Sequence, residues 1–326
     1  MPTAPMLDVR GLTVEYGSAD GAVTAVDRVD LEVAPGEFVG VVGESGCGKS
    51  TMLFAIAQLL SPPAMITAGT VRFLGQNLVT MTDKQLNVLR WRDLSVVMQS
   101  AMNALNPVAS IAAQFKDTMH AHGTSSRTEI HDRSVEVLKL VGIDPIHLRS
   151  YPHQLSGGMR QRAMIAMALL FSPDLVIMDE PTSALDVVAQ RSLMTQIKQL
   201  QERLGFAVLF VTHDMSLVSH FSDRLVVMYA AQIVEEGTTR SVFDNPLHPY
   251  SSGLLDAFPS IRGPRTRLLG LPGRPPELRN MPPGCRFQPR CGVAIDECAT
   301  TAPELYDGRT SRARCVHVRH PQQDAS

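Results

Sequence analysis

The sequence lacks an excess of either charge. Its 326 residues carry 30 Lys and Arg against 32 Asp and Glu, a formal net charge of −2. A general nucleic-acid-binding protein would lean basic, so this balance argues against that class and predicts no nucleic-acid partner. The hydrophobic fraction of 44% is ordinary, which excludes a largely disordered chain. The length predicts one large domain or two unequal ones.

Long apolar segments are also lacking. Residues 1–10 contain no basic stretch followed by an apolar core, so a secretory signal is not expected. One of the two longest uncharged runs, between Asp93 and Lys116, is interrupted by polar residues and a proline that an isolated membrane helix does not tolerate cheaply. We therefore predict no transmembrane span, and a protein that is cytosolic or lies on a membrane protein without crossing the bilayer.

Apolar runs alternate with helix-like stretches up to about position 240. Three short continuous runs are typical of buried parallel strands: Phe38–Val42, Leu175–Met178 and Ala207–Val211. Helical spacing follows the first run, at Met52, Leu53, Ile56, Leu59 and Leu60. Residues 112–170 suit helices and contain no clear strand. The pattern predicts an α/β fold with a mainly parallel sheet and a helical insertion.

Residues 43–50, Gly-Glu-Ser-Gly-Cys-Gly-Lys-Ser, fit the phosphate-binding loop pattern between a predicted strand and a predicted helix. Glycines let backbone N–H groups wrap around oxyanions, and the helix directs its positive end at the phosphates. Lys49 can reach the β and γ oxygens, and the Ser50 hydroxyl can ligate Mg²⁺. The alternative is a chance match in a glycine-rich turn, which the strand–loop–helix context disfavours. The candidate nucleotide-binding residues are Gly43, Glu44, Ser45, Gly46, Cys47, Gly48, Lys49, Ser50 and Thr51.

Two acids end the apolar run at 175–178. Parallel sheets place ligand-binding groups at the carboxyl ends of their strands, so Asp179 is a candidate Mg²⁺ ligand and Glu180 a candidate general base. The alternative is a strand that simply reaches solvent with two acids. His213 follows the run at 207–211 and is a candidate γ-phosphate contact. Gln99 follows an apolar run at 96–98 and is a candidate to sense Mg²⁺ or the attacking water, although a lone His or Gln is uninformative.

Further motifs point to a family. Leu155-Ser156-Gly157-Gly158-Met159 lies between the phosphate loop and the two acids, and Ser183-Ala184-Leu185-Asp186 follows them. With Tyr16, Gln99 and His213, this order over positions 5 to 240 resembles the ATPase subunits of ABC transporters. The resemblance implies a P-loop ABC ATPase domain at 1–245, with a helical subdomain at about 95–172. It also implies that two such domains close face to face on two ATP molecules.

The resemblance assigns roles across that dimer. Ser156, Gly157 and Gly158 would act in trans on the γ-phosphate held by the partner, and a hydroxyl with two glycines at a helix N-terminus suits an anion. Asp186 would contact the partner subunit. Tyr16 would stack on adenine, a contact worth about 1–3 kcal/mol by analogy with base stacking. The alternative for Tyr16 is a surface tyrosine at a turn. Gln99 would join Ser50 and Asp179 around Mg²⁺, and the segment after it resembles the part that meets the membrane subunit.

Three other segments, 99–107, 248–250 and 282–291, resemble the dipeptide, oligopeptide and nickel importer branch. Members of that branch take a solute from an extracytoplasmic binding protein through two transmembrane permease subunits. The resemblance implies a second, paralogous ATPase subunit and a peripheral position on the cytoplasmic side of the inner membrane. Peptide is the implied substrate, with a nickel complex or another small solute as the alternative.

The C-terminal extension, 246–326, differs in composition from the rest of the chain. More than half of the prolines lie from Pro246 onward, and four of the five cysteines lie at 285, 291, 298 and 315. The resemblance implies that Cys285, Cys291, Cys298 and Cys315 hold a [4Fe–4S] cluster. Their spacing alone leaves iron–sulfur, Zn²⁺ or unligated thiols open, because the gaps are wider than those of usual metal motifs. Any such metal would serve as a structural staple for a segment with few apolar runs.

Two competing functions are disfavoured. Soluble ABC ATPases of the repair or translation kind usually carry two such domains in one chain or a long coiled insertion, and 326 residues show neither. A metal-binding redox module is disfavoured because the cysteine segment is a small part of a chain with a complete ATPase motif set. Residues 225–229 and 232–236 predict a hairpin, although Ala230-Ala231 is poor turn chemistry and puts its local geometry in doubt.

Overall fold

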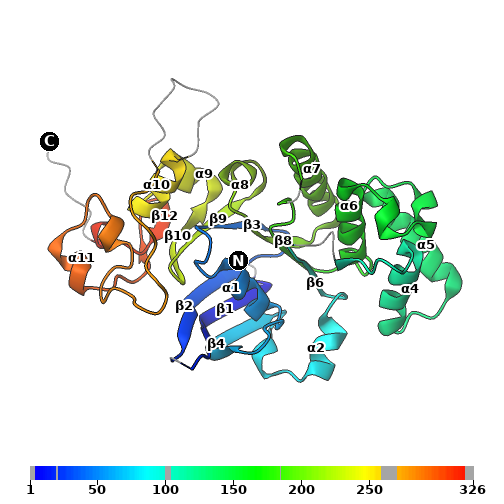
Figure 1. Ribbon diagram of the computed structural model, residues 1–326, viewed down its shortest axis with the longest axis horizontal. Helices are drawn as coiled ribbons and strands as arrows, with labels where there is room; N and C mark the ends of the chain where they lie inside the picture. The colour runs from blue at the N-terminus through cyan, green and yellow to red at the C-terminus, as the bar shows by residue number, and fades with distance from the viewer. Residues whose placement is uncertain (1–3, 20, 100–103, 184, 258–269, 320–326) are drawn as a thin grey trace. The chain divides into compact units, whose positions relative to one another are not determined.

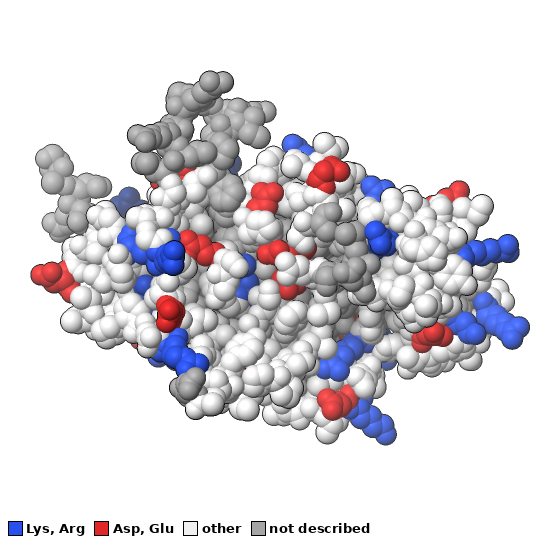
Figure 2. Space-filling view, in the orientation of Figure 1, with Lys and Arg blue, Asp and Glu red and all other residues white. Residues whose placement is uncertain are grey.

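The computed structural model describes residues 4–19, 21–99, 104–183, 185–257 and 270–319. Contacts divide the chain into two units. The helical unit contains residues 1–5, 33–38 and 80–210, and the phosphate-loop unit contains residues 6–32, 39–79 and 211–326. Among the described residues, no helix is long and apolar enough to cross a membrane. Basic and acidic side chains are interspersed on the face seen in Figure 2.

The phosphate-loop unit contains an antiparallel sheet that the sequence analysis did not predict. Its strand order is β2 (Val23–Val33), β1 (Leu7–Tyr16), β4 (Ala64–Phe73) and β5 (Gln76–Asn77). Buried residues alternate in each half of β1, at Leu7 and Val9 and then at Leu12 and Val14, and a register shift after Arg10 separates the two halves. This period of two is the ordinary signal of a strand with one buried face, and it was available in the sequence.

A second set of strands in this unit has the order β11 (Tyr306–Asp307), β12 (Ser311–Ala313), β10 (Gln232–Thr238), β9 (Arg224–Tyr229) and β3 (Phe38–Val42). Strands β3 and β9 are parallel, whereas β12 pairs antiparallel with β10. The C-terminal extension therefore adds strands to the edge of the sheet that contains β3. The helices of the unit are α1 (Lys49–Ile56), α8 (Met215–Phe221), α9 (Thr239–Asp244), α10 (Pro249–Asp256), α11 (Asp296–Thr300) and α12 (Val316–Arg319), with the 3₁₀ turn η4 (Gln288–Arg290).

The predicted helix after the phosphate loop is shorter than its apolar spacing suggested. Helix α1 ends at Ile56, so Leu59 and Leu60 lie beyond it, and their assignment to the helix was wrong. The chain turns at Gln58, whose φ of 55° is incompatible with a right-handed helix. Apolar spacing did not reveal this end, because no glycine or proline stands at the turn itself.

The predicted hairpin is confirmed, and its two alanines adopt the turn that glycine would favour. Ala230 and Ala231 have φ values of 46° and 72°, which fit a two-residue turn between β9 and β10. Left-handed backbone costs an alanine about 1–2 kcal/mol. Two hydrogen bonds hold the turn: the Ala231 N–H donates to the Cys47 carbonyl at 2.9 Å, and the Asp27 N–H donates to the Ala231 carbonyl at 2.8 Å. The turn is thereby fixed to the phosphate loop.

The helical unit confirms the predicted parallel strands and helical insertion. Its strands have the order β8 (Ala207–Val211), β7 (Leu175–Asp179) and β6 (Leu94–Val97), and β6 pairs with β7 in parallel. Helices α4, α5 and α6 lie side by side (Figure 1). The helices are α2 (Asp83–Leu89), α4 (Ile111–Ala121), α5 (Arg127–Leu140), α6 (Gly157–Ala168) and α7 (Val187–Leu204), and the 3₁₀ turns are η2 (Pro145–Arg149) and η3 (Pro152–Gln154). The 3₁₀ turn η1 (Leu78–Thr80) stands where the chain passes from the phosphate-loop unit to the helical unit.

Candidate functional site

The phosphate loop requires glycine at two positions. Gly43 and Gly48 have φ values of 154° and 105°. A Cβ at Gly43 would lie 2.2 Å from the Met228 carbonyl oxygen, and one at Gly48 would lie 2.1 Å from the Ala25 carbonyl oxygen. Any larger residue would therefore have to displace backbone on the neighbouring strands. The close packing fixes the path of the loop against β2 and β9.

The loop wraps around the ammonium group of Lys49. Lys49 is 6% exposed, and its Nζ donates to the carbonyl oxygens of Gly43 at 2.7 Å and Glu44 at 2.9 Å. Helix α1 begins at this lysine with Gly48 as its N-cap, no side-chain cap and no acidic residue in its first turn. Its first N–H groups and positive dipole end are thus not neutralised by a local carboxylate, which suits a phosphate ligand.

Other residues of the loop differ in exposure. Ser45 is exposed, Gly46 is exposed with a φ of 78°, and Ser50 is half-buried. Burial raises the pKa of the Cys47 thiol although Lys49 lies beside it. The hydroxyl of Thr51 lies 3.2 Å from that of Tyr16, a residue that is 36% exposed at the end of β1. The tyrosine predicted to stack on adenine is therefore accessible and lies next to α1.

Glu44 has two partners that sequence reasoning missed, one at its carboxylate and one at its backbone N–H. Arg290 donates two hydrogen bonds to it, at 2.8 and 2.9 Å, and the hydroxyl of Tyr250 accepts from the Glu44 N–H at 2.9 Å. Both partners belong to the C-terminal extension. The only signal in the sequence is their place in the segments that resemble the peptide importer branch, and a resemblance does not reveal a contact.

The two predicted catalytic residues of the helical unit meet each other. Asp179 ends β7 and is 2% exposed, and Glu180 follows it with a φ of 44°. Gln99 lies just after β6, and its Nε2 donates to Glu180 Oε2 at 2.9 Å. Because β6 and β7 are parallel neighbours with Val97 opposite Met178, their carboxyl ends bring these side chains together. The pair is suited to hold a polar group at the strand ends.

The predicted trans-acting residues stand at helix N-termini. Ser156 caps α6, where its Oγ accepts from the Met159 N–H at 3.2 Å, and Gly157 and Gly158 open that helix. Asp186 caps α7 and accepts from the Ala189 N–H at 2.9 Å. The first turn of α6 contains no acidic residue. Ala184 and residues 100–103, which belong to predicted motifs, lie outside the described residues.

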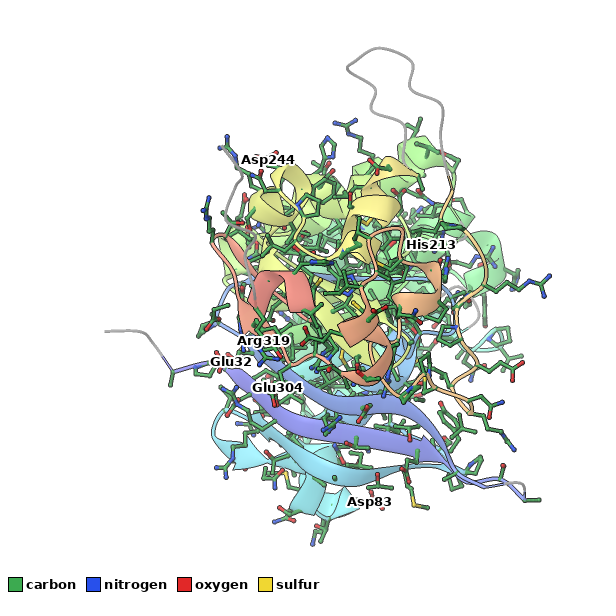
Figure 3. All side chains as sticks on the ribbon, turned by 90° about the vertical axis from the view of Figure 1, so that its left-hand side faces the viewer. Glu32, Asp83, His213, Asp244, Glu304 and Arg319 are labelled. Carbon is green, nitrogen blue, oxygen red and sulfur yellow. The ribbon has the colours of Figure 1, made fainter. Side chains whose placement is uncertain are left out.

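His213 lies between β8 and α8 and is exposed (Figure 3). The residue after it, Asp214, caps α8 by accepting hydrogen bonds from the N–H groups of Ser216 and Leu217. The histidine therefore stands at the end of a buried strand, in the position from which the sequence predicted a phosphate contact.

The four cysteines of the extension line one small cavity together with Phe287 and Val316. Cys298 and Cys315 are buried, whereas Cys285 and Cys291 are half-buried. The Cys285 N–H donates to the Cys298 carbonyl at 2.8 Å, which joins the two segments that carry them. Burial raises the pKa of Cys315 to about 11. Within the described residues, no three His, Cys, Asp or Glu side chains are placed to share one metal ion.

Fold and site define a class. A strand–loop–helix that wraps a buried lysine, and two acids at the end of a parallel strand, are the features of a P-loop ATPase. Residues 26–183 match the family model described as ABC transporter. A solved structure described as the dimeric structure of MJ0796, a bacterial ABC transporter cassette, is similar over 72% of this chain and 99% of that one, with a TM-score of 0.65 and 30% identity. The chain has the ABC ATPase fold.

The comparisons also distinguish the branch. Residues 234–298 match the model described as the C-terminal region of oligopeptide/dipeptide transporters. The oligopeptide transport ATP-binding protein OppD of Escherichia coli is 40% identical over 93% of this chain and 91% of its own length. The dipeptide transport ATP-binding protein DppD of Caldanaerobacter subterraneus is 38% identical over 92% of both chains. This chain therefore belongs to the dipeptide and oligopeptide family of ABC transporter ATP-binding proteins.

Proposed function

We propose that this chain hydrolyses ATP to drive uptake of dipeptides or oligopeptides. The observation that carries the proposal is the oligopeptide/dipeptide region at 234–298, which is built onto the unit that contains the phosphate loop. The relatives named for peptide transport match over nearly their whole length, which supports the same cargo class here. A nickel complex or another small solute is the alternative substrate.

The residues divide the chemistry among them. Lys49 and the loop N–H groups hold the phosphates, and Tyr16 stacks on adenine. Glu180, oriented by its hydrogen bond with Gln99, takes the proton of the attacking water, and His213 contacts the γ-phosphate. Hydroxyl, amide and carboxylate oxygens are the ligands that Mg²⁺ prefers, so Ser50, Gln99 and the buried Asp179 fit that ion. Bound Mg²⁺ would neutralise phosphate charge.

The proposed complex contains further chains. The partner is a second, paralogous ATPase subunit. The γ-phosphate of the ATP that it holds is contacted by Ser156, Gly157 and Gly158 of this chain, and Asp186 contacts the partner subunit itself. The N-terminus of α6 supports that role, because no acidic residue in its first turn opposes an anion. Two permease subunits and an extracytoplasmic binding protein complete the importer. The chain lies at the cytoplasmic side of the inner membrane, with its ATPase domain at 1–245, its helical subdomain at about 95–172 and its extension at 246–326.

The four cysteines of the extension line one small cavity, and thiolates are ligands that suit an iron–sulfur cluster or Zn²⁺. The resemblance to the peptide importer branch favours the cluster, and Zn²⁺ is the alternative. We propose that Cys285, Cys291, Cys298 and Cys315 hold such a cluster as a structural staple of the extension.

Metal analysis tests this staple. Protein purified without oxygen is expected to contain about four irons and four acid-labile sulfides per chain and to absorb broadly near 400 nm. Replacing Cys315 by serine is expected to lower the iron content, while replacing Cys47, which lies outside the cavity, leaves it unchanged. Stoichiometric zinc without iron would refute the cluster and identify Zn²⁺ as the metal of the extension. Protein with no bound metal would refute the staple and show that the four cysteines are unligated thiols packed in the extension.

Uptake in cells tests the function. Deleting the gene is expected to abolish accumulation of a labelled dipeptide or oligopeptide, and the Lys49→Ala variant is expected not to restore it, because the phosphate loop loses its ammonium group. The wild-type gene serves as the control. Unchanged peptide uptake together with lost nickel accumulation would select the alternative solute. Normal uptake of every solute tested would refute an importer.

A further inference from the structure

The phosphate loop is held by the C-terminal extension through an ion pair. Arg290 lies beside Cys291, and its side chain is 5% exposed. Its guanidinium donates to both carboxylate oxygens of Glu44 in the paired geometry that Arg and carboxylate favour. Its Nε donates to the Pro272 carbonyl at 2.7 Å, so a second residue of the extension fixes the orientation of the Arg290 guanidinium. The hydrogen bonds with Glu44 raise the pKa of Arg290 above its ordinary value.

A second link reaches the loop backbone. Tyr250 is wholly buried, and its hydroxyl accepts from the Glu44 N–H at 2.9 Å. Its ring packs against Tyr229, with centroids 4.5 Å apart, and against Phe287 at 5.5 Å. The start of α10 is fixed because His248 accepts from the Tyr250 N–H at 3.0 Å and Pro249 follows at the first helical position. Both ends of the tyrosine are therefore held in place.

The ion pair with Arg290 neutralises the negative charge that Glu44 brings into the phosphate loop. Glu44 places a carboxylate in a loop whose other features attract anions. An unpaired carboxylate would repel the phosphates of ATP, and more strongly where water is partly excluded. Arg290 neutralises this charge and holds the carboxylate through two hydrogen bonds. Tyr250 fixes the orientation of the Glu44 peptide group. The extension thus supplies two groups that the phosphate loop lacks.

We propose that Arg290 and Tyr250 are positioning residues for the phosphate loop, through which the C-terminal extension sets the affinity for ATP. This inference rests on the proposed ATPase function and extends it, because it makes the extension part of the nucleotide site. Neither residue is a catalytic group, since both act through Glu44. Their loss is therefore expected to weaken nucleotide binding more than it slows the bound reaction.

The test measures MgATP affinity and steady-state kinetics on the full chain. Replacing Arg290 by methionine is expected to raise the Kd and KM for MgATP about tenfold or more, with kcat changed much less, because a hydrogen-bonded charge pair is lost. Adding Glu44→Gln to this variant is expected to restore most of the affinity, since no unpaired carboxylate remains. Tyr250→Phe is expected to weaken binding by a few-fold. A purely structural role for Arg290 would not give rescue by Glu44→Gln.

Arg314 provides the matched control. It lies beside Cys315, and its guanidinium donates to the carbonyl oxygens of Ile233 and Pro303, both at 3.0 Å, without contacting the loop. Arg314→Met is expected to keep the Kd for MgATP within about twofold of wild type. Iron content and the thermal midpoint are measured on every variant. If Arg290→Met does not fold, Arg290→Lys serves instead. It keeps the positive charge without the paired hydrogen bonds of a guanidinium, and it is expected to lose part of the affinity for MgATP.

Two results would overturn the inference. One is equal MgATP affinity in the Arg290 and Arg314 variants, and the other is failure of Glu44→Gln to restore binding to a folded Arg290→Met chain. Wild-type protein that binds no MgATP would instead contradict the proposed ATPase function. The two failures are thus distinguishable in one set of titrations.

Discussion

Replacing Glu180 by glutamine is expected to lower the rate of ATP hydrolysis by about 10²–10⁴-fold, the usual contribution of a general base. The change preserves the shape of the side chain and removes its ability to take a proton. ATP binding is expected to remain, because the residues that hold the phosphates are unchanged. With binding kept and turnover lost, the ATP-bound dimer should accumulate in its closed form. Single-turnover hydrolysis and size-exclusion chromatography with MgATP measure both effects.

The control for this experiment is Glu202→Gln, an exposed glutamate on α7 of the same unit. It is expected to hydrolyse ATP at the wild-type rate. A Glu180→Gln variant with near wild-type turnover would refute the assignment of the base. A variant that binds no ATP would show that Glu180 acts on the structure of the site rather than on the water. Gln99→Ala, which removes the partner at 2.9 Å, should reduce turnover less, because the carboxylate remains.

Replacing Ser156 by arginine is expected to reduce hydrolysis at the partner's nucleotide by about 10²-fold, the scale seen when one preorganised donor is removed. The bulky cation fills the start of α6, where Ser156, Gly157 and Gly158 are proposed to meet the γ-phosphate in trans. ATP is expected to bind normally at this chain's own phosphate loop, which the substitution does not touch. Nucleotide binding to the isolated chain and hydrolysis by the assembled pair of ATPase subunits separate the two sites.

Ser126→Arg is the matched control, because Ser126 caps α5 as Ser156 caps α6. Both substitutions remove a helix cap, at a cost of about 1 kcal/mol to stability. Only Ser156→Arg is expected to change hydrolysis. Equal activity of the two variants would remove Ser156 from the composite site. Loss of ATP binding at the variant's own loop would contradict the trans arrangement.

Local patterns were sufficient to predict much of the fold. The buried parallel strands appear as uninterrupted apolar runs, and β3 and β8 begin and end at the predicted residues. The antiparallel sheet of β1, β2 and β4 was missed, and in β1 the period of two is interrupted by a register shift after Arg10. The end of α1 was misplaced because a left-handed Gln58 leaves no mark in the sequence. The sequence marked Ala230-Ala231 as poor turn chemistry, but only the structure shows the tertiary hydrogen bonds that stabilise this turn.

The sequence by itself determined the phosphate loop and the acids at the end of β7, because each is a short local motif, and it indicated the family through the order of such motifs. Only the tertiary structure decided which distant groups meet. Gln99 and Glu180 are 81 positions apart, and the parallel register of β6 and β7 joins them. Arg290 and Glu44 are 246 positions apart, and the packing of the extension against the phosphate loop joins them. Such pairs are set by long-range packing, which local spacing does not encode.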